Sequence, residues 1–307
     1  MLGGGGAVGH GYHGGVLAAL EEVVAFDARD ADVIVGTSSG ATVAGLVRAG
    51  LSGSDLASRA CSGRMSERMH SVDAQRTGAR IRPAEVRVRL TLTGPASPRG
   101  AWRATRRTDG ARRLGPVFGA LLPAGPMPTV TAGGALDRLF PHGWPSRAMW
   151  IAAVGIDDGM RVMFGRNGEP ATDVATAVAA SCALPGLFRP VVVDEQRYID
   201  GAVWSATNAD ALADEALELV IVSAPLSAGV SPLHAWQRRH LRQEVRHLRS
   251  RGIPVVVIEP SRRETAAMGV NIMDKSRRQA VTRHVRASVR ERLEQGDLAR
   301  HRELLAG

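Results

Sequence analysis

Apolar positions along this chain follow two spacings, which predict an alternation of strands and helices. Apolar runs typical of buried strands occupy 32–35, 217–222 and 255–258. Apolar residues at helical spacing predict helices at 16–25, 40–49, 173–181, 233–250 and 276–295. Strand-like stretches at 149–155 and 161–164, and at 190–193 and 197–199, predict two hairpins. This order predicts one α/β domain over residues 1–307, with a layered fold around a mostly parallel sheet.

Residues 52–148 interrupt this pattern. The part from 94 to 128 is rich in Pro, Gly and Arg, which is typical of loops. A short apolar piece broken by proline follows at 121–128. We therefore expect an insertion at 52–148 that is either a lid or membrane-facing segment, or a surface loop without a role of its own.

Composition narrows the class of protein. The 307 residues are 44% hydrophobic, enough for a large core, and carry a formal net charge of +9 that is almost entirely arginine, because Lys275 is the only lysine. Few aromatic residues accompany the arginines, so we expect no nucleic acid partner. No apolar run is long enough for a transmembrane segment, and no signal peptide is evident, so we expect a cytoplasmic protein, with peripheral membrane contact allowed. Cys61 and Cys182 neither demand nor exclude a disulfide, and no metal-binding spacing is present.

The candidate nucleophile is Ser38, in the sequence Gly36-Thr37-Ser38-Ser39-Gly40. A serine on a sharp turn between a strand and a helix needs small residues on both sides, because the two backbones nearly touch there. An apolar strand precedes this motif and a helical pattern follows it, as that turn requires. Gly36 and Gly40 are therefore expected to form the nucleophile elbow. The alternative is an ordinary connection in which serines cap the helix.

A glycine-rich loop is predicted at residues 3–15. Gly4, Gly5 and Gly6 could direct successive backbone N–H groups at one oxygen, as an oxyanion hole requires. The same segment satisfies the G-x-G-x-x-G pattern of dinucleotide-binding proteins, with an acid at Glu21, Glu22 or Asp27 as the ribose ligand. That pattern expects a strand directly before it, where only Met1-Leu2 stands. A nucleotide-binding oxidoreductase is thus an alternative, as is a purely structural glycine turn.

The candidate base is Asp200, which follows the predicted strand 197–199 and begins Asp200-Gly201-Ala202. A carboxylate can deprotonate a serine directly if it is close and shielded from water. Histidine is the usual partner, and His234, His240 and His247 follow Asp200 in the order of α/β-hydrolases. They lie in a basic helical stretch where exposure is expected. His13-Gly14-Gly15 is similar to the H-G-G loop of some lipases but lies very close to the serine.

Together these three motifs, in this order, resemble the patatin-like phospholipase family. Stretches near them add to the likeness: AASCALPGLFRP at 179–190, SATNAD at 205–210 and MGVNIMD at 268–274. The resemblance covers residues 3–50 and 149–275. It implies a three-layer αβα sandwich with a central, mostly parallel sheet, and no metal or other cofactor. It also implies hydrolysis of lipid or phospholipid esters at a membrane surface. It implies that Ser38 attacks the acyl carbonyl, Asp200 takes its proton, and the N–H groups of Gly4, Gly5 and Gly6 hold the oxyanion.

The chain departs from the family pattern at two places. Val8 stands where the family usually has Arg or Lys, and the strand before the glycines is reduced to Met1-Leu2. These departures leave open a catalytically inactive lipid-binding homologue. The sequence does not indicate an oligomeric state, an acyl chain preference or an activating partner.

Overall fold

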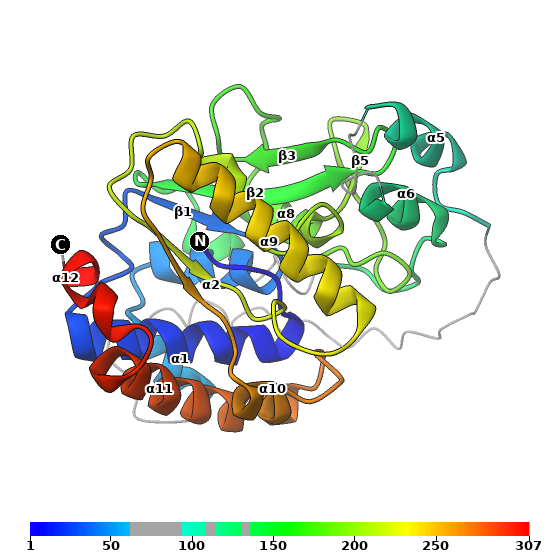
Figure 1. Cartoon of the computed structure of the whole chain (residues 1–307). Coiled ribbons are helices and arrows are strands. Elements are labelled where there is room, and N and C mark those ends of the chain that lie inside the picture. The colour runs from blue at the N-terminus through cyan, green and yellow to red at the C-terminus, as the bar shows by residue number, and fades with distance from the viewer. Residues whose placement is uncertain (62–93, 108–113, 130–135, 307) are drawn as a thin grey trace.

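A mixed β-sheet forms the middle layer of the molecule (Figure 1). The computed structural model describes residues 1–61, 94–107, 114–129 and 136–306. The strands are β1 (Val33–Gly36), β2 (Ala148–Gly155), β3 (Arg161–Phe164), β4 (Val191–Val193), β5 (Gln196–Asp200), β6 (Val220–Ser223) and β7 (Val255–Ile258). β1 pairs with β2 and β6 with β7 in parallel, whereas β3 and β5 run antiparallel to β2, and β4 antiparallel to β5. The predicted α/β sandwich is confirmed, with parallel pairs in one part of the sheet and the predicted hairpins in the other.

Helices cover both faces of this sheet. The α-helices are α1 (Gly6–Val24), α2 (Ser39–Arg48), α3 (Gly53–Ala60), α5 (Pro98–Arg107), α6 (Leu114–Leu121), α8 (Val174–Ser181), α9 (Pro232–Ser250), α10 (Arg262–Met268), α11 (Arg278–Gln295) and α12 (Arg302–Ala306). Successive residues of β2 point to opposite faces. Met149, Ile151 and Ala153 pack with residues of α1, α2, α8 and α11, while Trp150 and Ala152 pack with α9. Both faces of β2 are therefore buried.

The first three residues occupy the place of a strand between β1 and β6. The Leu2 N–H donates to the Val35 carbonyl at 2.9 Å, and the Leu2 carbonyl accepts from the Thr37 N–H at 3.0 Å. On the other side, the Gly3 N–H donates to the Ser223 carbonyl at 3.0 Å. These bonds join the two parallel pairs into one sheet. They also anchor the glycine segment that follows, despite the short apolar stretch before it.

The glycine-rich stretch at residues 3–15, which we expected to be a loop, is helical from Gly6 onward. Its glycines allow close packing of helices. A Cβ added at Gly11 or Gly15 would lie 2.6 Å or 2.8 Å from a backbone carbonyl oxygen of α11. The prediction was wrong because glycine disfavours an isolated helix, whereas here it removes side chains that would keep α11 away from α1.

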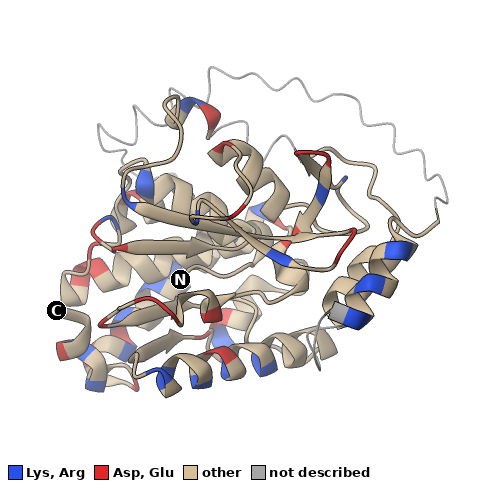
Figure 2. Cartoon of the chain, turned by 90° about the horizontal axis from the view of Figure 1, so that it is seen from above, with Lys and Arg blue, Asp and Glu red and all other residues tan. Residues whose placement is uncertain are grey.

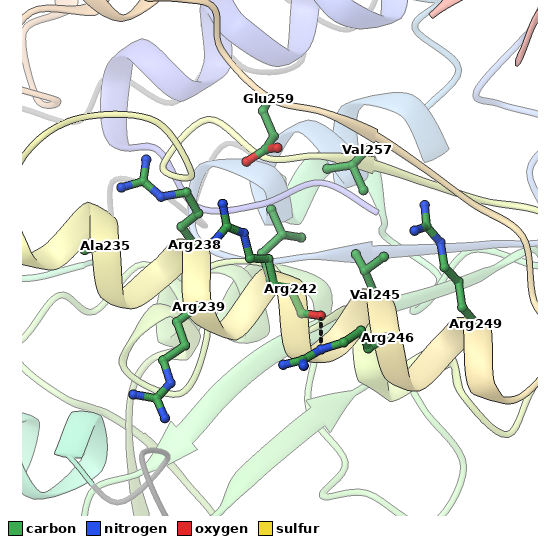
Figure 3. Close-up of a pocket in the computed structure, with 10 residues that line it drawn as sticks. Ala235, Arg238, Arg239, Arg242, Val245, Arg246, Arg249, Val257 and Glu259 are labelled. Carbon is green, nitrogen blue, oxygen red and sulfur yellow. Dashed lines mark hydrogen bonds between the residues drawn. The ribbon is translucent and has the colours of Figure 1, made fainter. Parts of the chain in front are cut away.

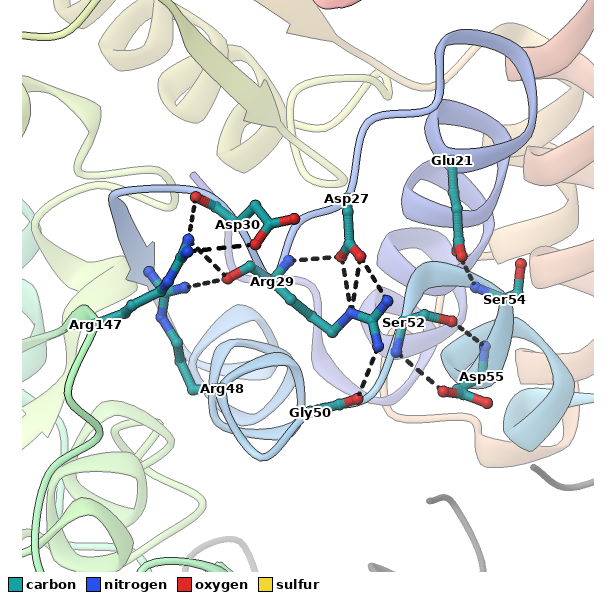
Figure 4. Close-up of polar contacts among 10 residues, drawn as sticks. All are labelled: Glu21, Asp27, Arg29, Asp30, Arg48, Gly50, Ser52, Ser54, Asp55 and Arg147. Atoms are coloured by element: carbon teal, nitrogen blue, oxygen red, sulfur yellow. Dashed lines mark hydrogen bonds and ion pairs between the residues drawn. The ribbon is translucent and has the colours of Figure 1, made fainter. Parts of the chain in front are cut away.

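Arg48, at the end of α2, bonds to the turn before β1, where its Nη1 donates to the Arg29 carbonyl at 3.0 Å (Figure 4). Its Nη2 donates to the carbonyl oxygens of Ala31 and Ala148, both at 2.8 Å. In the turn before β1, Arg29 forms an ion pair with Asp27. Because strands of fixed register bring their ends to fixed places, these contacts also fix the carboxyl end of β1, where Gly36 lies.

Part of the predicted insertion at 52–148 lies outside the described residues, namely 62–93, 108–113 and 130–135. Its described part includes the neighbouring helices α5 and α6. Ala101 of α5 and Ala120 of α6 join a small apolar cluster with Val154 of β2 and Ile199 of β5. These two helices therefore pack where β2 and β5 end, next to Asp200.

The packing of α2 on the N-terminal residues yields a prediction about stability. A Cβ added at Gly40 would lie 2.0 Å from the Leu2 carbonyl oxygen, so we expect Gly40→Ala to lower the free energy of unfolding by about 3 kcal/mol. Urea denaturation measures this change. Gly94→Ala is the matched control, because nothing lies within 4 Å of its added Cβ. Equal unfolding midpoints for the two variants would contradict the close approach.

Candidate active site

Ser38 lies in the sharp turn between β1 and α2. Its backbone has φ 53° and ψ −117°, a conformation that residues with a Cβ rarely adopt and that is typical of a nucleophile elbow. The turn requires the flanking glycines, since a Cβ added at Gly36 would lie 2.5 Å from the Cα of Ala41. The Ser38 N–H donates to the Ser181 hydroxyl at 2.8 Å. These contacts hold Ser38 at the N-terminus of α2.

Asp200 is the last residue of β5 and is only 2% exposed. Burial raises the pKa of its carboxyl to about 7. Two interactions lower the pKa and so limit this rise: the Ala202 N–H, which donates to Oδ1 at 2.8 Å, and the Ser38 hydroxyl. Close to neutral pH, such a carboxylate can both accept and return a proton.

One cavity of about 400 Å³ joins the predicted site residues. Its lining includes Ser38, Asp200, Gly4, Gly5 and Gly6, which come from three separate parts of the sequence. Most of the remaining wall is apolar, from Leu46, Leu184, Phe188, Leu226, Ile272 and Met273. The structure thus brings together a hydroxyl, a buried carboxylate and a glycine segment in a space suited to an apolar chain.

The glycine segment lies directly beside the serine. A Cβ added at Gly4 would lie 3.6 Å from the Ser38 Cβ. The Gly4 N–H is already engaged, because it donates to the Ala206 carbonyl at 2.8 Å. Among the described residues, the N–H groups of Gly5 and Gly6 have no acceptor, and they lie at the N-terminus of α1, where the helix dipole favours negative charge.

A family model described as patatin-like phospholipase matches residues 1–213. The chain belongs to the patatin-like phospholipase family. A comparison with curated proteins finds no match. The matched range contains all three motifs: the glycine segment, the elbow around Ser38, and Asp200-Gly201-Ala202. The family assigns the protein to lipid hydrolases in general.

His13 has a structural role in this patatin-like fold. It is fully buried in α1, where Nε2 donates to the Gly3 carbonyl at 2.7 Å and Nδ1 accepts from the Ser223 hydroxyl at 2.8 Å. Burial lowers the pKa of His13 to about 4, so the ring is neutral at physiological pH. His13 therefore holds the start of the glycine segment and does not line the cavity.

Of four further histidines considered as bases, one lines the Ser38 cavity and three do not. His234, His240 and His247, which follow Asp200 in sequence, lie on α9 and are absent from the cavity lining. His10, in the first turns of α1, does line it. A test of Asp200 as the base must therefore include His10 as the rival base.

Asn208 connects the two halves of the patatin-like site, a role that the sequence did not indicate. Its buried Nδ2 donates to the Thr37 hydroxyl at 3.1 Å and to the Gly201 carbonyl at 3.4 Å. Thr37 precedes the candidate nucleophile, and Gly201 follows the candidate base. Asn208 adopts a left-handed backbone with φ 56°, which asparagine tolerates well. The only sequence signal for this residue is its place in SATNAD, after the aspartate motif.

Cys182 also lines the cavity. Burial and the nearby Asp200 charge raise the pKa of its thiol to about 12, so Cys182 is protonated and a poor nucleophile. Neither Cys182 nor Cys61 forms a disulfide. Within the described residues, no group of three or more His, Cys, Asp or Glu side chains is arranged to bind a metal ion.

A larger hollow of about 880 Å³ lies along α9, away from these residues (Figure 3). Arginines line much of it, namely Arg238, Arg239, Arg242, Arg246 and Arg249. Its lining holds one carboxylate, Glu259, and no Ser, Cys or His. This groove therefore lacks the groups for nucleophilic catalysis, and the smaller cavity at Ser38 is the candidate active site.

The raised pKa of Asp200 predicts a pH-dependent cost in stability. The folded carboxyl, with a pKa of about 7, binds its proton more tightly than the unfolded one at about 3.8, so the wild type loses stability as pH rises through this window. Asn does not titrate. We therefore expect Asp200→Asn to gain stability relative to the wild type as pH rises from about 4 to about 7, and to keep that gain above pH 7. Urea denaturation of both proteins tests this, and a pH-independent difference would contradict the raised pKa.

Proposed function

We propose that this protein is a serine acyl hydrolase that cleaves carboxylic esters of lipids with a Ser38–Asp200 dyad. The observation that supports it most is the buried Asp200 carboxylate, which interacts with the Ser38 hydroxyl inside an apolar cavity. Ser38 attacks the ester carbonyl while Asp200 accepts its proton and passes it to the leaving alcohol. Water deprotonated by Asp200 then releases the acyl group from Ser38.

The oxyanion of each tetrahedral intermediate is held by backbone N–H groups. We assign Gly5 and Gly6 as the donors, because the Gly4 N–H is engaged by Ala206. Gly4 contributes in another way, since its missing side chain leaves room beside the Ser38 Cβ. The N-termini of α1 and α2 both lie at this point, and their dipoles favour the developing charge.

The nucleotide-binding alternative has less support. Each acid that could bind a ribose already has a partner. Glu21 accepts from the Ser54 N–H at 2.7 Å, Glu22 forms an ion pair with Arg286, and Asp27 forms one with Arg29.

Val8, where the family usually has a cation, is completely buried. An inactive lipid-binding homologue remains the second candidate, and covalent labelling separates it from an enzyme.

Loss of the nucleophile or the base should abolish turnover. We expect Ser38→Ala and Asp200→Asn to lower kcat/KM for a soluble ester by about 10³-fold or more. Ser38→Ala should also end labelling by a fluorophosphonate, measured by mass spectrometry. Ser39→Ala is the matched control and should keep the label. Turnover retained by Asp200→Asn but lost in His10→Ala would reassign the base to His10.

We further propose that the enzyme meets its substrate as a peripheral protein at a membrane surface. None of the described helices is both long and apolar enough to span a bilayer. Trp102 of α5 and Phe118 of α6 are 57% and 65% exposed, which is a large exposed fraction for aromatic side chains. Arginines flank them along α5, as the basic bands at the right of Figure 2 show. Exposed aromatic and basic side chains together are typical of contact with an anionic bilayer.

This surface lies next to the cavity. Gly119 of α6 follows the exposed Phe118, and a Cβ added at Gly119 would contact Pro185 and Val203. Met127 forms a β-bridge with Phe188, which lines the cavity. Contact between this surface and a bilayer would thus place the cavity close to lipid.

Removing the exposed aromatic side chains should weaken membrane binding. We expect Trp102→Ser and Phe118→Ser each to lower the partition coefficient onto anionic vesicles by about tenfold. Cosedimentation with vesicles measures it. Leu304→Ser is the control, because Leu304 is also exposed but lies on α12, far from α5 in Figure 1. Equal binding by all three variants would remove this surface from the proposal.

A further inference from the structure

Gln237 of α9 is a buried polar side chain that does not line the Ser38 cavity. It is only 4% exposed, and a buried amide is unfavourable unless both of its polar groups are hydrogen-bonded. Its Oε1 accepts from the Ala206 N–H at 2.7 Å, and its Nε2 donates to the Ala202 carbonyl at 3.2 Å. Because an N–H only donates and a carbonyl only accepts, one orientation of the amide satisfies both. Gln237 therefore joins two backbone positions in the segment that follows Asp200.

Both backbone positions belong to residues that also contact the candidate active site. The Ala202 N–H donates to Oδ1 of Asp200 at 2.8 Å. The Ala206 carbonyl accepts from the Gly4 N–H at 2.8 Å, and the proposed oxyanion donors follow Gly4 directly. Gln237 thus contacts both the residue that bonds to the proposed base and the residue that anchors the glycine segment.

The described segment between β5 and β6 depends on such contacts for its position. It contains no strand, and its regular structure consists of two short 3-10 turns, Gly201–Val203 and Ala209–Leu212. Glu244, two turns after Gln237 on α9, accepts from the Ala209 N–H at 3.1 Å. Buried side chains of α9 therefore hold this segment at two places, Gln237 at the place nearer to β5.

Gln237 also packs closely behind Gly4. Together with Leu241 these residues border a space of about 10 Å³, which has room for at most one water molecule. A side chain without an amide would leave the Ala206 N–H and the Ala202 carbonyl without partners where little water can replace them. The backbone would then have to move to find new partners, and the groups bonded to it would move as well.

We infer that Gln237 is a positioning residue, which directs the Ala202 N–H at the Asp200 carboxylate and holds the Gly4 backbone beside Ser38. The proposed base and the proposed oxyanion donors thereby keep one relative geometry. Gln237 acts through the backbone and touches neither the substrate nor the reacting atoms. The inference rests on the proposed hydrolase and adds to it a residue outside the cavity.

Kinetics with a soluble short-chain ester over a range of pH test this role. We expect Gln237→Met, which removes both bonds at similar volume, to lower kcat about tenfold and to leave KM within about twofold. The Ala202 N–H lowers the pKa of Asp200, so its loss should move the rise of kcat with pH to higher pH. Leu241→Met is the matched control, because it changes a buried apolar side chain one turn along α9 and should keep both values.

A purely structural role predicts a different result. A smaller folded fraction would lower kcat without moving its pH midpoint. Gln237→Asn carries the same amide on a shorter side chain, which cannot span both backbone groups, so we expect a kcat between those of the wild type and Gln237→Met. It also provides the test if Gln237→Met does not fold. A wild-type kcat and pH midpoint in the variants that fold would overturn the positioning role.

A measurement without turnover separates this inference from the hydrolase proposal. The titration midpoint of the Asp200 carboxyl is followed by NMR in the wild type, Gln237→Met and Leu241→Met. We expect a higher midpoint in Gln237→Met alone. That shift, in a protein whose wild type shows no turnover, would keep the positioning role and reject the hydrolase. Turnover by the wild type without a shift in Gln237→Met would keep the hydrolase and overturn the positioning role.

Discussion

The site depends on the removal of one carboxylate from water. Asp200 is charged only at a cost, because it is buried where β5 pairs with β2 and bonds to the turn after α8. That cost makes the carboxylate a stronger base than a solvated one, as the proposed mechanism, with no imidazole partner for the serine, requires. Ser38 stores a second cost in its left-handed backbone. The burial of a large core on both faces of β2 stabilises the fold enough to offset both costs.

Residues distant in sequence meet because the sheet brings their strands together. β1 ends at the elbow, β5 ends at Asp200, and both pair with β2. Asn208 then bonds to the residue before the serine and the residue after the aspartate, so the two motifs are positioned as a unit. Val8, where the family usually has a cation, is part of the core. Arg278 contacts the glycine segment from another helix, because its Nε donates to the Ala7 carbonyl.

Much of the fold, and five of the residues that line the Ser38 cavity, could be predicted from the sequence. The apolar runs gave the strands, and the small residues around Ser38 gave its turn, because both are local constraints. The helical state of Gly11 and Gly15 could not be predicted, since it depends on α11, which is remote in sequence. The role of Asn208 was missed for the same reason. Single polar residues have no periodicity, and only the folded chain shows what they contact.

The contact between Ser38 and Asp200 can be measured directly by following the Asp200 carboxyl carbon by NMR during a pH titration, with Asp200→Asn assigning the signal. The account predicts a midpoint at about 7 in the wild type. It also predicts a higher midpoint in Ser38→Ala, because the hydroxyl that lowers the pKa is gone. A midpoint near the ordinary value of about 3.8, or one that does not move when the hydroxyl is removed, would contradict the dyad.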